Sequence, residues 1–101
     1  MKNEADVKKV VKKILNSYPE TEMWYFMPSA NGYGRSGIPD FVGCYKGNFF
    51  AIETKFGGNH PTNNQLREIQ GVIQAKGMCW IVRDSSLSGW EHEFRGWAAL
   101  C

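Results

Sequence analysis

The chain has 101 residues, of which 43% are hydrophobic and 22% are charged, and these proportions are typical of a soluble globular protein. No apolar run approaches the ~20 residues that span a bilayer and no signal-peptide pattern opens the sequence, so we expect no membrane association and a cytoplasmic location, in the host cell if the protein is viral. The net charge of +2 is too small to indicate a nucleic-acid-binding protein by itself.

The first predicted element is a helix over residues 4–17, capped by Asn3. Its apolar residues follow one helical stripe, and Glu4 falls near the middle of that stripe. An acid in this place either compensates the helix dipole in a solvated first turn or points toward a functional site. Lysines, among them Lys8 and Lys12, line the other side, and such a run usually forms a solvated helix face.

A strand over residues 23–27 precedes a loop over residues 28–37, whose glycines and polar residues disfavour regular structure. The loop leads directly to Asp40, so we expect it to overhang any site to which Asp40 belongs. Within the loop, Arg35 offers phosphate pairing and Tyr33 offers contact with a base or a sugar. The alternative is a plain flexible loop.

Two β-prone runs, residues 41–45 and 48–52, predict a β-hairpin. Either Lys46-Gly47 or Gly47-Asn48 supplies its turn. The choice of turn fixes which residues of the two strands face each other.

The hairpin brings three charged side chains together. With the first turn Asp40 stands opposite Glu53, and with the second it stands opposite Lys55. Because side chains alternate along a strand, both turns place all three on one face of the sheet. Directly opposed acids repel each other, and a fold tolerates them when a cation sits between them. We therefore predict a site for a hard divalent ion such as Mg²⁺ or Mn²⁺.

A flexible stretch over residues 56–61 contains His60, which is either a phosphate-binding residue or an ordinary exposed loop histidine. A helix over residues 63–76 follows. Its cap, Thr62, forms a capping box with Gln65, which is a sufficient structural reason for Gln65. Gln65 also lies on the helix face that must pack on the sheet, where its amide could reach the metal site.

Residues 78–82 predict a second buried strand, which should lie parallel to the hairpin strand that ends at Lys55. A last helix is expected within residues 85–100, although Gly89 and Gly96 weaken that prediction. The whole pattern predicts an α/β protein with a mixed central sheet of about four strands flanked by helices.

A nuclease motif lies at the centre of this pattern. Pro39-Asp40, followed after twelve residues by Glu53-Thr54-Lys55, resembles the PD-(D/E)XK nuclease motif. The surrounding residues are similar, in order, to those of the virus-type replication-repair nuclease (VRR-NUC) domain, from about Glu4 to Arg83; they are Asn31-Gly32, Arg35, Gly37-Ile38-Pro39-Asp40, Thr62 and Gln65. The resemblance implies one VRR-NUC-type domain over residues 1–101 with a restriction-endonuclease-like core.

The resemblance also implies the roles of the site residues. Asp40 and Glu53 are expected to bind the divalent ion, with the backbone carbonyl of Thr54 as a third ligand. Lys55 is expected to orient the attacking water or to stabilise charge on the phosphate, while Glu4 and Gln65 complete the catalytic set. The family often has an aliphatic residue where Thr54 stands, so the Thr54 hydroxyl needs a hydrogen-bond partner or exposure to solvent.

Stand-alone domains of this family look like homodimeric Holliday-junction resolvases, which act in DNA repair. The resemblance therefore implies a Mg²⁺- or Mn²⁺-dependent endonuclease acting as a homodimer on branched DNA such as a four-way junction. The expected DNA-contacting residues are Arg35, Tyr33, Lys8, Lys12 and His60. The alternatives are a flap, nick or single-strand nuclease, a non-catalytic DNA-binding module on the same fold, and an interaction protein that uses the aromatic C-terminal segment.

Overall fold

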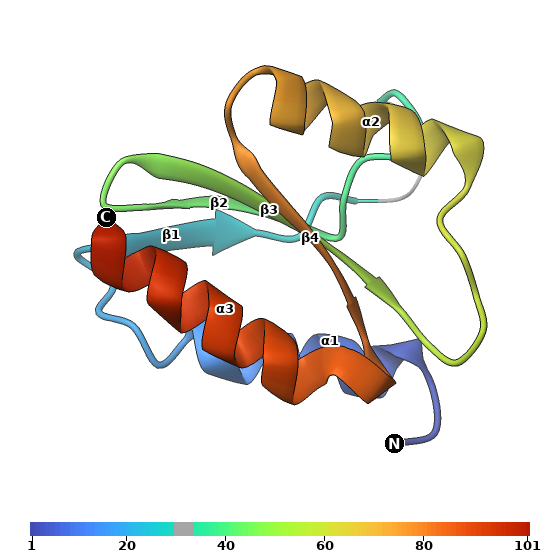
Figure 1. Cartoon of the computed structure of the whole chain (residues 1–101), viewed down its shortest axis with the longest axis horizontal. Helices are drawn as coiled ribbons and strands as arrows, with labels where there is room; N and C mark the ends of the chain where they lie inside the picture. The colour runs from blue at the N-terminus through green and yellow to red at the C-terminus, as the bar shows by residue number, and fades with distance from the viewer. Residues whose placement is uncertain (30–33) are drawn as a thin grey trace.

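The structure is a computed structural model that describes residues 1–29 and 34–101. In chain order its elements are α1 (Glu4–Leu15), β1 (Met23–Phe26), β2 (Phe41–Tyr45), β3 (Asn48–Lys55), α2 (Asn63–Gln74), β4 (Met78–Arg83), a 3-10 turn (Asp84–Ser86) and α3 (Leu87–Leu100) (Figure 1). The predicted α/β class with a mixed four-stranded sheet is confirmed, and the arrangement is consistent with a restriction-endonuclease-like core. The predicted Tyr33 and Asn31-Gly32 lie outside the described residues.

The strands lie in the order β1-β2-β3-β4. The first three are antiparallel and β4 runs parallel to β3, as expected for a strand that follows a helix. Tyr45 pairs with Asn48, so Lys46-Gly47 is the hairpin turn and the first of the two predicted registers is the correct one. Both turn residues have positive φ, 49° for Lys46 and 82° for Gly47, as a two-residue hairpin turn of the I′ type requires.

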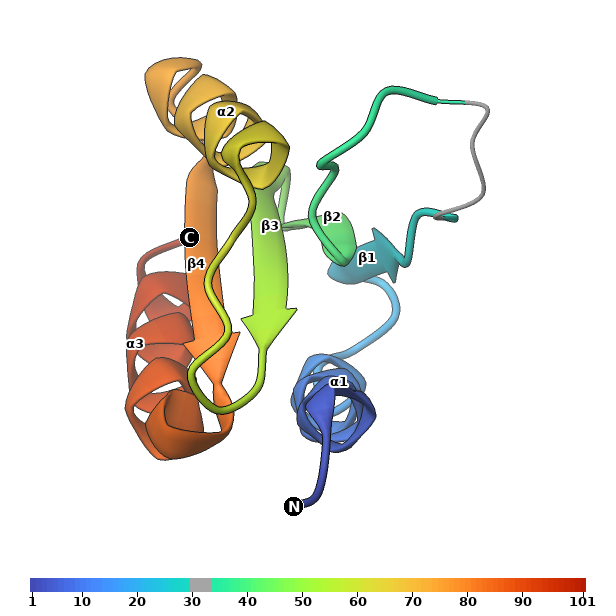
Figure 2. The same ribbon diagram turned by 90° about the vertical axis from the view of Figure 1, so that its right-hand side faces the viewer.

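The two faces of the sheet have different covers. In Figure 1 the strands lie between α2 on one side and α1 with α3 on the other, and Figure 2 shows α2 across β3 and β4. Phe50 of β3 contacts Phe94 of α3, whereas Glu53 of the same strand contacts Gln65 of α2. Because side chains alternate along β3, residues 50, 52 and 54 face α1 and α3, and residues 49, 51, 53 and 55 face α2.

The hydrophobic core lies on the side of α1 and α3. Phe94 stands at its centre and contacts the rings of Phe50, Trp80 and Trp90. The buried positions of α3 recur every four residues, and the two glycines of this helix have open space around them. Packing of this apolar face therefore stabilises a helix whose glycines disfavour it locally.

The ends of four elements differ slightly from the predictions. α1 ends at Leu15 instead of residue 17, because the N–H groups of Ser17 and Tyr18 bond to carbonyls three residues back. α2 ends at Gln74, and Lys76, with φ at 73°, takes the left-handed conformation that usually follows a helix.

The remaining two differences concern strands. β1 ends at Phe26, one residue earlier than predicted, and β4 ends at Arg83, one residue later. The prediction of a buried strand over residues 78–82 is wrong, because β4 lies at the edge of the sheet and only Val82 of it is buried.

Candidate active site

Asp40 lies in a bend immediately before β2. Its Oδ2 accepts two hydrogen bonds from Thr54, one from the backbone N–H at 2.9 Å and one from the hydroxyl at 2.6 Å. The side chain of Thr54 is fully buried and belongs to the α1 side of the sheet. Because Asp40 lies in a bend, its side chain does not follow the alternation of side chains along the strand. The Thr54 hydroxyl has in Asp40 the hydrogen-bond partner that it needed.

The other oxygen of Asp40 faces α1. Lys8 Nζ lies 3.7 Å from Asp40 Oδ1 and 3.6 Å from Glu4 Oε2, so the ammonium group stands between two carboxylates. The negative charge of Glu4 contributes to raising the pKa of Glu53. The first turn of α1 thus lies beside the motif residues, and Lys8 belongs to the cluster instead of the solvated face of the helix.

Glu53 is almost completely buried, with 1% of its surface exposed. Its Oε2 accepts a hydrogen bond from Gln65 Nε2 at 2.9 Å and lies 3.2 Å from Lys55 Nζ. Its Oε1 is buried and has no hydrogen-bond partner among the described residues. A buried carboxylate oxygen without a partner is costly, so this atom marks a place where a ligand would stabilise the fold.

The pKa of Glu53 is raised to about 7, chiefly by burial and then by the negative charge of Asp40, against the opposing hydrogen bond and charge of Lys55. Near neutral pH the carboxyl group therefore exchanges between its protonated and charged forms. A cation close to Glu53 would favour the charged form.

Gln65 forms the capping box that its sequence position predicted, and its amide also reaches Glu53. Its Oε1 accepts from the Thr62 N–H at 2.8 Å, and the Thr62 hydroxyl accepts from the Gln65 N–H at 3.2 Å, which completes a capping box. Because the capping box uses the oxygen of the amide, the nitrogen is directed to Glu53. The start of α2 is thereby attached to β3. The predicted contact of this amide with a metal-bound water or a phosphate stays a prediction.

The loop before Asp40 is attached to α2 at Gly37. This glycine has φ at 86°, and a Cβ at its position would lie 2.4 Å from the carbonyl carbon of Asn64 and 2.7 Å from the Gln65 nitrogen. Only glycine allows this approach. Next to it, Asn64 Nδ2 donates to the Ser36 hydroxyl at 2.7 Å. The loop that ends at Asp40 and the helix that carries Gln65 are therefore packed against each other.

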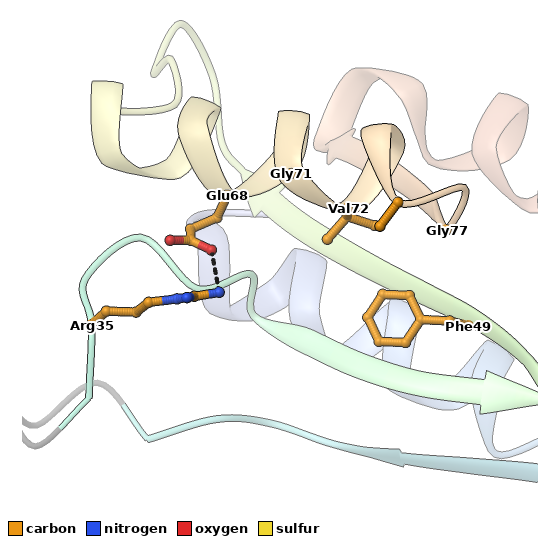
Figure 3. Close-up of a pocket in the computed structure, with 7 residues that line it drawn as sticks. Arg35, Phe49, Glu68, Gly71, Val72 and Gly77 are labelled. Atoms are coloured by element: carbon orange, nitrogen blue, oxygen red, sulfur yellow. Dashed lines mark ion pairs between the residues drawn. The ribbon is translucent and has the colours of Figure 1, made fainter.

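An ion pair extends this attachment. Arg35 Nη2 lies 3.0 Å from Glu68 Oε1, and Figure 3 shows the two side chains meeting across the groove between the loop and α2. Arg35 has 74% of its side chain exposed, whereas Glu68 has 13%. This groove has a volume of about 390 Å³ and extends to Phe49 and Val72.

A second pocket of about 400 Å³ is lined by residues of the loop, and its lining also includes Asp40 and Gln65.

The predicted DNA-contacting residues lie in different surroundings. Lys12 and His60 are exposed, one on α1 and the other in the loop after Lys55. Arg83 and Asp84 hold that loop, since Arg83 donates to the Asn59 carbonyl and Asp84 accepts from the Gly57 N–H at 3.0 Å. Tyr33 cannot be placed because it is not among the described residues.

The chemistry of two carboxylates, Asp40 and Glu53, is compatible with a divalent ion, and the negative charge of Asp40 acts on Glu53. Within residues 1–29 and 34–101 no three His, Cys, Asp or Glu side chains form a metal-binding group. Mg²⁺ is usually bound by one or two carboxylates and keeps several waters, so two acids are a sufficient protein contribution. Glu53 Oε1 is a buried oxygen without a partner, and Asp40 Oδ1 meets only Lys8 among the described residues. The predicted role of the Thr54 carbonyl stays a prediction.

Three contributing residues were missing from the sequence-based set, namely the loop attachments Ser36, Asn64 and Glu68. Lys8 was predicted as a DNA-contacting residue but not as a partner of Asp40. Lys8 follows Glu4 by one helical turn, and this spacing on a helix with an inward acid is a signal that could have indicated it. The contacts between the loop and α2 join residues 27 or more positions apart, and no local sequence pattern predicts them.

Comparison of the sequence with known families and with proteins of curated function gives no match. No helix in the described part of the chain has the length and apolar character needed to cross a membrane. The assignment of a function therefore depends on the geometry of the site.

Proposed function

We propose that this protein is a Mg²⁺- or Mn²⁺-dependent DNA endonuclease of the VRR-NUC type within the PD-(D/E)XK superfamily, which acts on branched DNA as a homodimer. One observation carries the proposal. In both carboxylates, one oxygen is saturated by protein donors and the other lacks a hydrogen-bond donor among the described residues. Thr54 saturates Asp40 Oδ2, while Gln65 and Lys55 occupy Glu53 Oε2.

This pattern supports ion binding over a purely structural role. A structural ion pair would be expected to satisfy both oxygens of a buried acid, since an orphaned buried oxygen costs about 1–3 kcal/mol. Here no described residue bonds to Glu53 Oε1, while two donors converge on Oε2. The donors hold both carboxylates in fixed orientations, and fixed ligands lower the entropy lost when an ion binds.

Each site residue has its own role in the proposed reaction. Asp40 and Glu53 would hold a divalent ion, which supplies polarisation of the scissile phosphate and acidifies an attacking water. Lys55 keeps its ammonium group beside Glu53 with only 9% of the residue exposed, so it would stabilise charge that develops on the phosphate. Gln65 orients Glu53.

The nucleic acid would lie across two surfaces that flank Asp40. The exposed Lys12 extends the site along α1, and the exposed guanidinium group of Arg35 extends it along the loop. Arg35 would exchange Glu68 for a phosphate, because a guanidinium group pairs well with either anion. His60 would contribute from the loop after Lys55.

The proposed dimer follows from the symmetry of the proposed substrate. One chain provides one pair of carboxylates, and symmetric resolution of a four-way junction needs two cuts related by a two-fold axis. The size of the protein in solution, measured by light scattering, tests this part. A monomer at working concentration would leave the nuclease proposal in place but reject the resolvase.

A cleavage panel tests the function. The wild type, Asp40→Asn and Glu53→Gln are incubated with a four-way junction, a flap and plain duplex, each with EDTA, Mg²⁺ or Mn²⁺. We expect ion-dependent cleavage that prefers the junction, and a decrease of at least about a hundredfold in both variants, since an ion contributes several kcal/mol to the transition state. DNA binding should persist.

The matched control is Glu20→Gln, which removes the same charge from an exposed residue beyond the far end of α1. It should cleave at the wild-type rate. Undiminished cleavage by Asp40→Asn or Glu53→Gln would reject the proposed site. DNA binding without any cleavage by the wild type would instead favour a non-catalytic binding module.

A further inference from the structure

Lys8 is the cation closest to the proposed ion site on the α1 side. Its ammonium group lies 3.7 Å from Asp40 Oδ1 and 3.6 Å from Glu4 Oε2, and about a third of its side chain is exposed. Within the described residues, no other lysine or arginine forms an ion pair with Asp40. The ammonium group therefore offsets part of the negative charge of Glu4 and Asp40.

Lys8 lies beside Asp40 Oδ1, the oxygen to which an ion would bind. Asp40 Oδ2 already accepts two hydrogen bonds from Thr54, so Oδ1 is the oxygen left for another ligand. An ammonium group and a divalent cation repel each other strongly at contact distance. Lys8 in its present position and an ion on Oδ1 therefore exclude each other.

We propose that Lys8 is the counter-ion of the ion-free site, which competes with the divalent ion for Asp40 Oδ1 and is released toward a DNA phosphate when the ion binds. This inference rests on the proposed function and adds a coupling between ion and DNA. Without an ion, the charge of Lys8 is used within the protein. With an ion bound, it is available to the nucleic acid, and such coupling acts equally in both directions.

Titration with Mn²⁺ in a calorimeter, without DNA, tests the competition. Lys8→Met removes the charge and keeps an unbranched side chain, so it should bind Mn²⁺ about three- to fivefold more tightly than the wild type. This change corresponds to about 0.7–1 kcal/mol, the upper part of what a partly exposed ion pair contributes. Lys8→Arg keeps the charge and should bind like the wild type.

Lys13→Met is the matched control. It removes the same charge from the same helix a little more than one turn further on, where the side chain is exposed. Its Mn²⁺ affinity should change by less than about twofold. Equal or weaker Mn²⁺ binding by Lys8→Met, or equal tightening in Lys13→Met, would overturn the proposal. Thermal melting of each variant shows that it is folded.

Binding to a four-way junction gives a second readout, measured by fluorescence anisotropy in EDTA and in Ca²⁺, which takes oxygen ligands. Lys8→Met should lose affinity in Ca²⁺, with a salt slope smaller by about 1, and change little in EDTA. An equal loss under both conditions would mean that Lys8 contacts DNA without competing for the ion, which contradicts the coupling.

The outcomes separate this inference from the proposed function. If the wild type binds no Mn²⁺, both fail. If the wild type binds Mn²⁺ and Asp40→Asn abolishes that binding, the ion site stands. In that case an unchanged affinity in Lys8→Met rejects only the role of Lys8.

Discussion

Gln65 Nε2 donates a hydrogen bond of 2.9 Å to Glu53 Oε2 while the oxygen of the same amide caps α2 through the Thr62 N–H. One side chain thus connects the start of a helix to the buried acid of the neighbouring strand. A capping box needs only an acceptor at this position, and glutamate provides one as well as glutamine. The donor is needed only by Glu53, so the two roles can be separated by mutation.

Gln65→Glu should keep the cap and lose the contact with Glu53. The variant places a second acid beside Glu53, so we expect the ion-free protein to lose about 1–3 kcal/mol of unfolding free energy at pH 8. Urea unfolding followed by circular dichroism measures this. Gln65→Met, which loses both the cap and the contact with Glu53, is the variant with which the stability of Gln65→Glu is compared. A Gln65→Glu protein as stable as the wild type at pH 8 would show that capping alone accounts for the residue.

The raised pKa of Glu53 predicts an unusual pH dependence of stability. The ordinary value is 4.5 and the folded value is about 7, so between these values the folded state holds a proton that the unfolded state has lost. Stability of the ion-free protein should therefore fall as pH rises from about 4.5 to 7, by at most roughly 2–3 kcal/mol from this group.

The measurement is urea unfolding of the wild type and Glu53→Gln in EDTA across that pH range. Glutamine does not titrate, so the difference between the two proteins isolates Glu53. Asp40, Glu4 and Lys55 remain in both proteins. A difference that stays constant from pH 4.5 to 8 would contradict the raised pKa.

The Thr54 hydroxyl should matter for ion binding through Asp40. Thr54→Val has nearly the same shape but removes one of the two donors to Asp40 Oδ2, which frees the carboxylate to rotate. We expect Mn²⁺ affinity to fall by about tenfold, the usual range for removing a group that orients a metal ligand. Thr54→Ser retains the hydroxyl and should bind within about threefold of the wild type. Equal affinities in the two variants would show that the hydroxyl only fills space.

Gly37→Ala should disturb the attachment between the loop and α2. The added Cβ would lie 2.4 Å from the Asn64 backbone, and the φ of 86° is unfavourable for alanine. We expect a loss of at least about 1–3 kcal/mol in unfolding free energy, together with weaker Mn²⁺ binding. Gly34→Ala, whose surroundings are open, should change stability by about 0.5 kcal/mol or less. A similar small effect in both variants would reject a structural role for the close approach.

Local patterns predicted most of the fold. The period of apolar residues predicted the helices and strands. The two-residue turn left two possible registers for the hairpin, and the structure has the one in which Tyr45 pairs with Asn48. The C-terminal helix was the weakest prediction, because Gly89 and Gly96 disfavour it locally. The contacts of Phe94 with Phe50 and Trp80 stabilise this helix, and those contacts depend on tertiary structure.

The site was less accessible from sequence. Side-chain alternation placed Glu53 and Lys55 on one face correctly, and their contact at 3.2 Å follows from it. Alternation does not extend to Asp40, since this residue lies in a bend outside the strand and bonds to Thr54. The position of Lys8 depends on how α1 packs on the face of the sheet, which no sequence period specifies.

The central claim is that one divalent ion lies between Asp40 and Glu53. Anomalous scattering from a crystal soaked in Mn²⁺ tests it most directly. We predict one strong peak per chain within coordination distance of Asp40 Oδ1 and Glu53 Oε1, and no peak there in Glu53→Gln. Absence of a peak at this place in wild-type crystals that show well-ordered carboxylates, or a peak that persists in Glu53→Gln, would contradict the account.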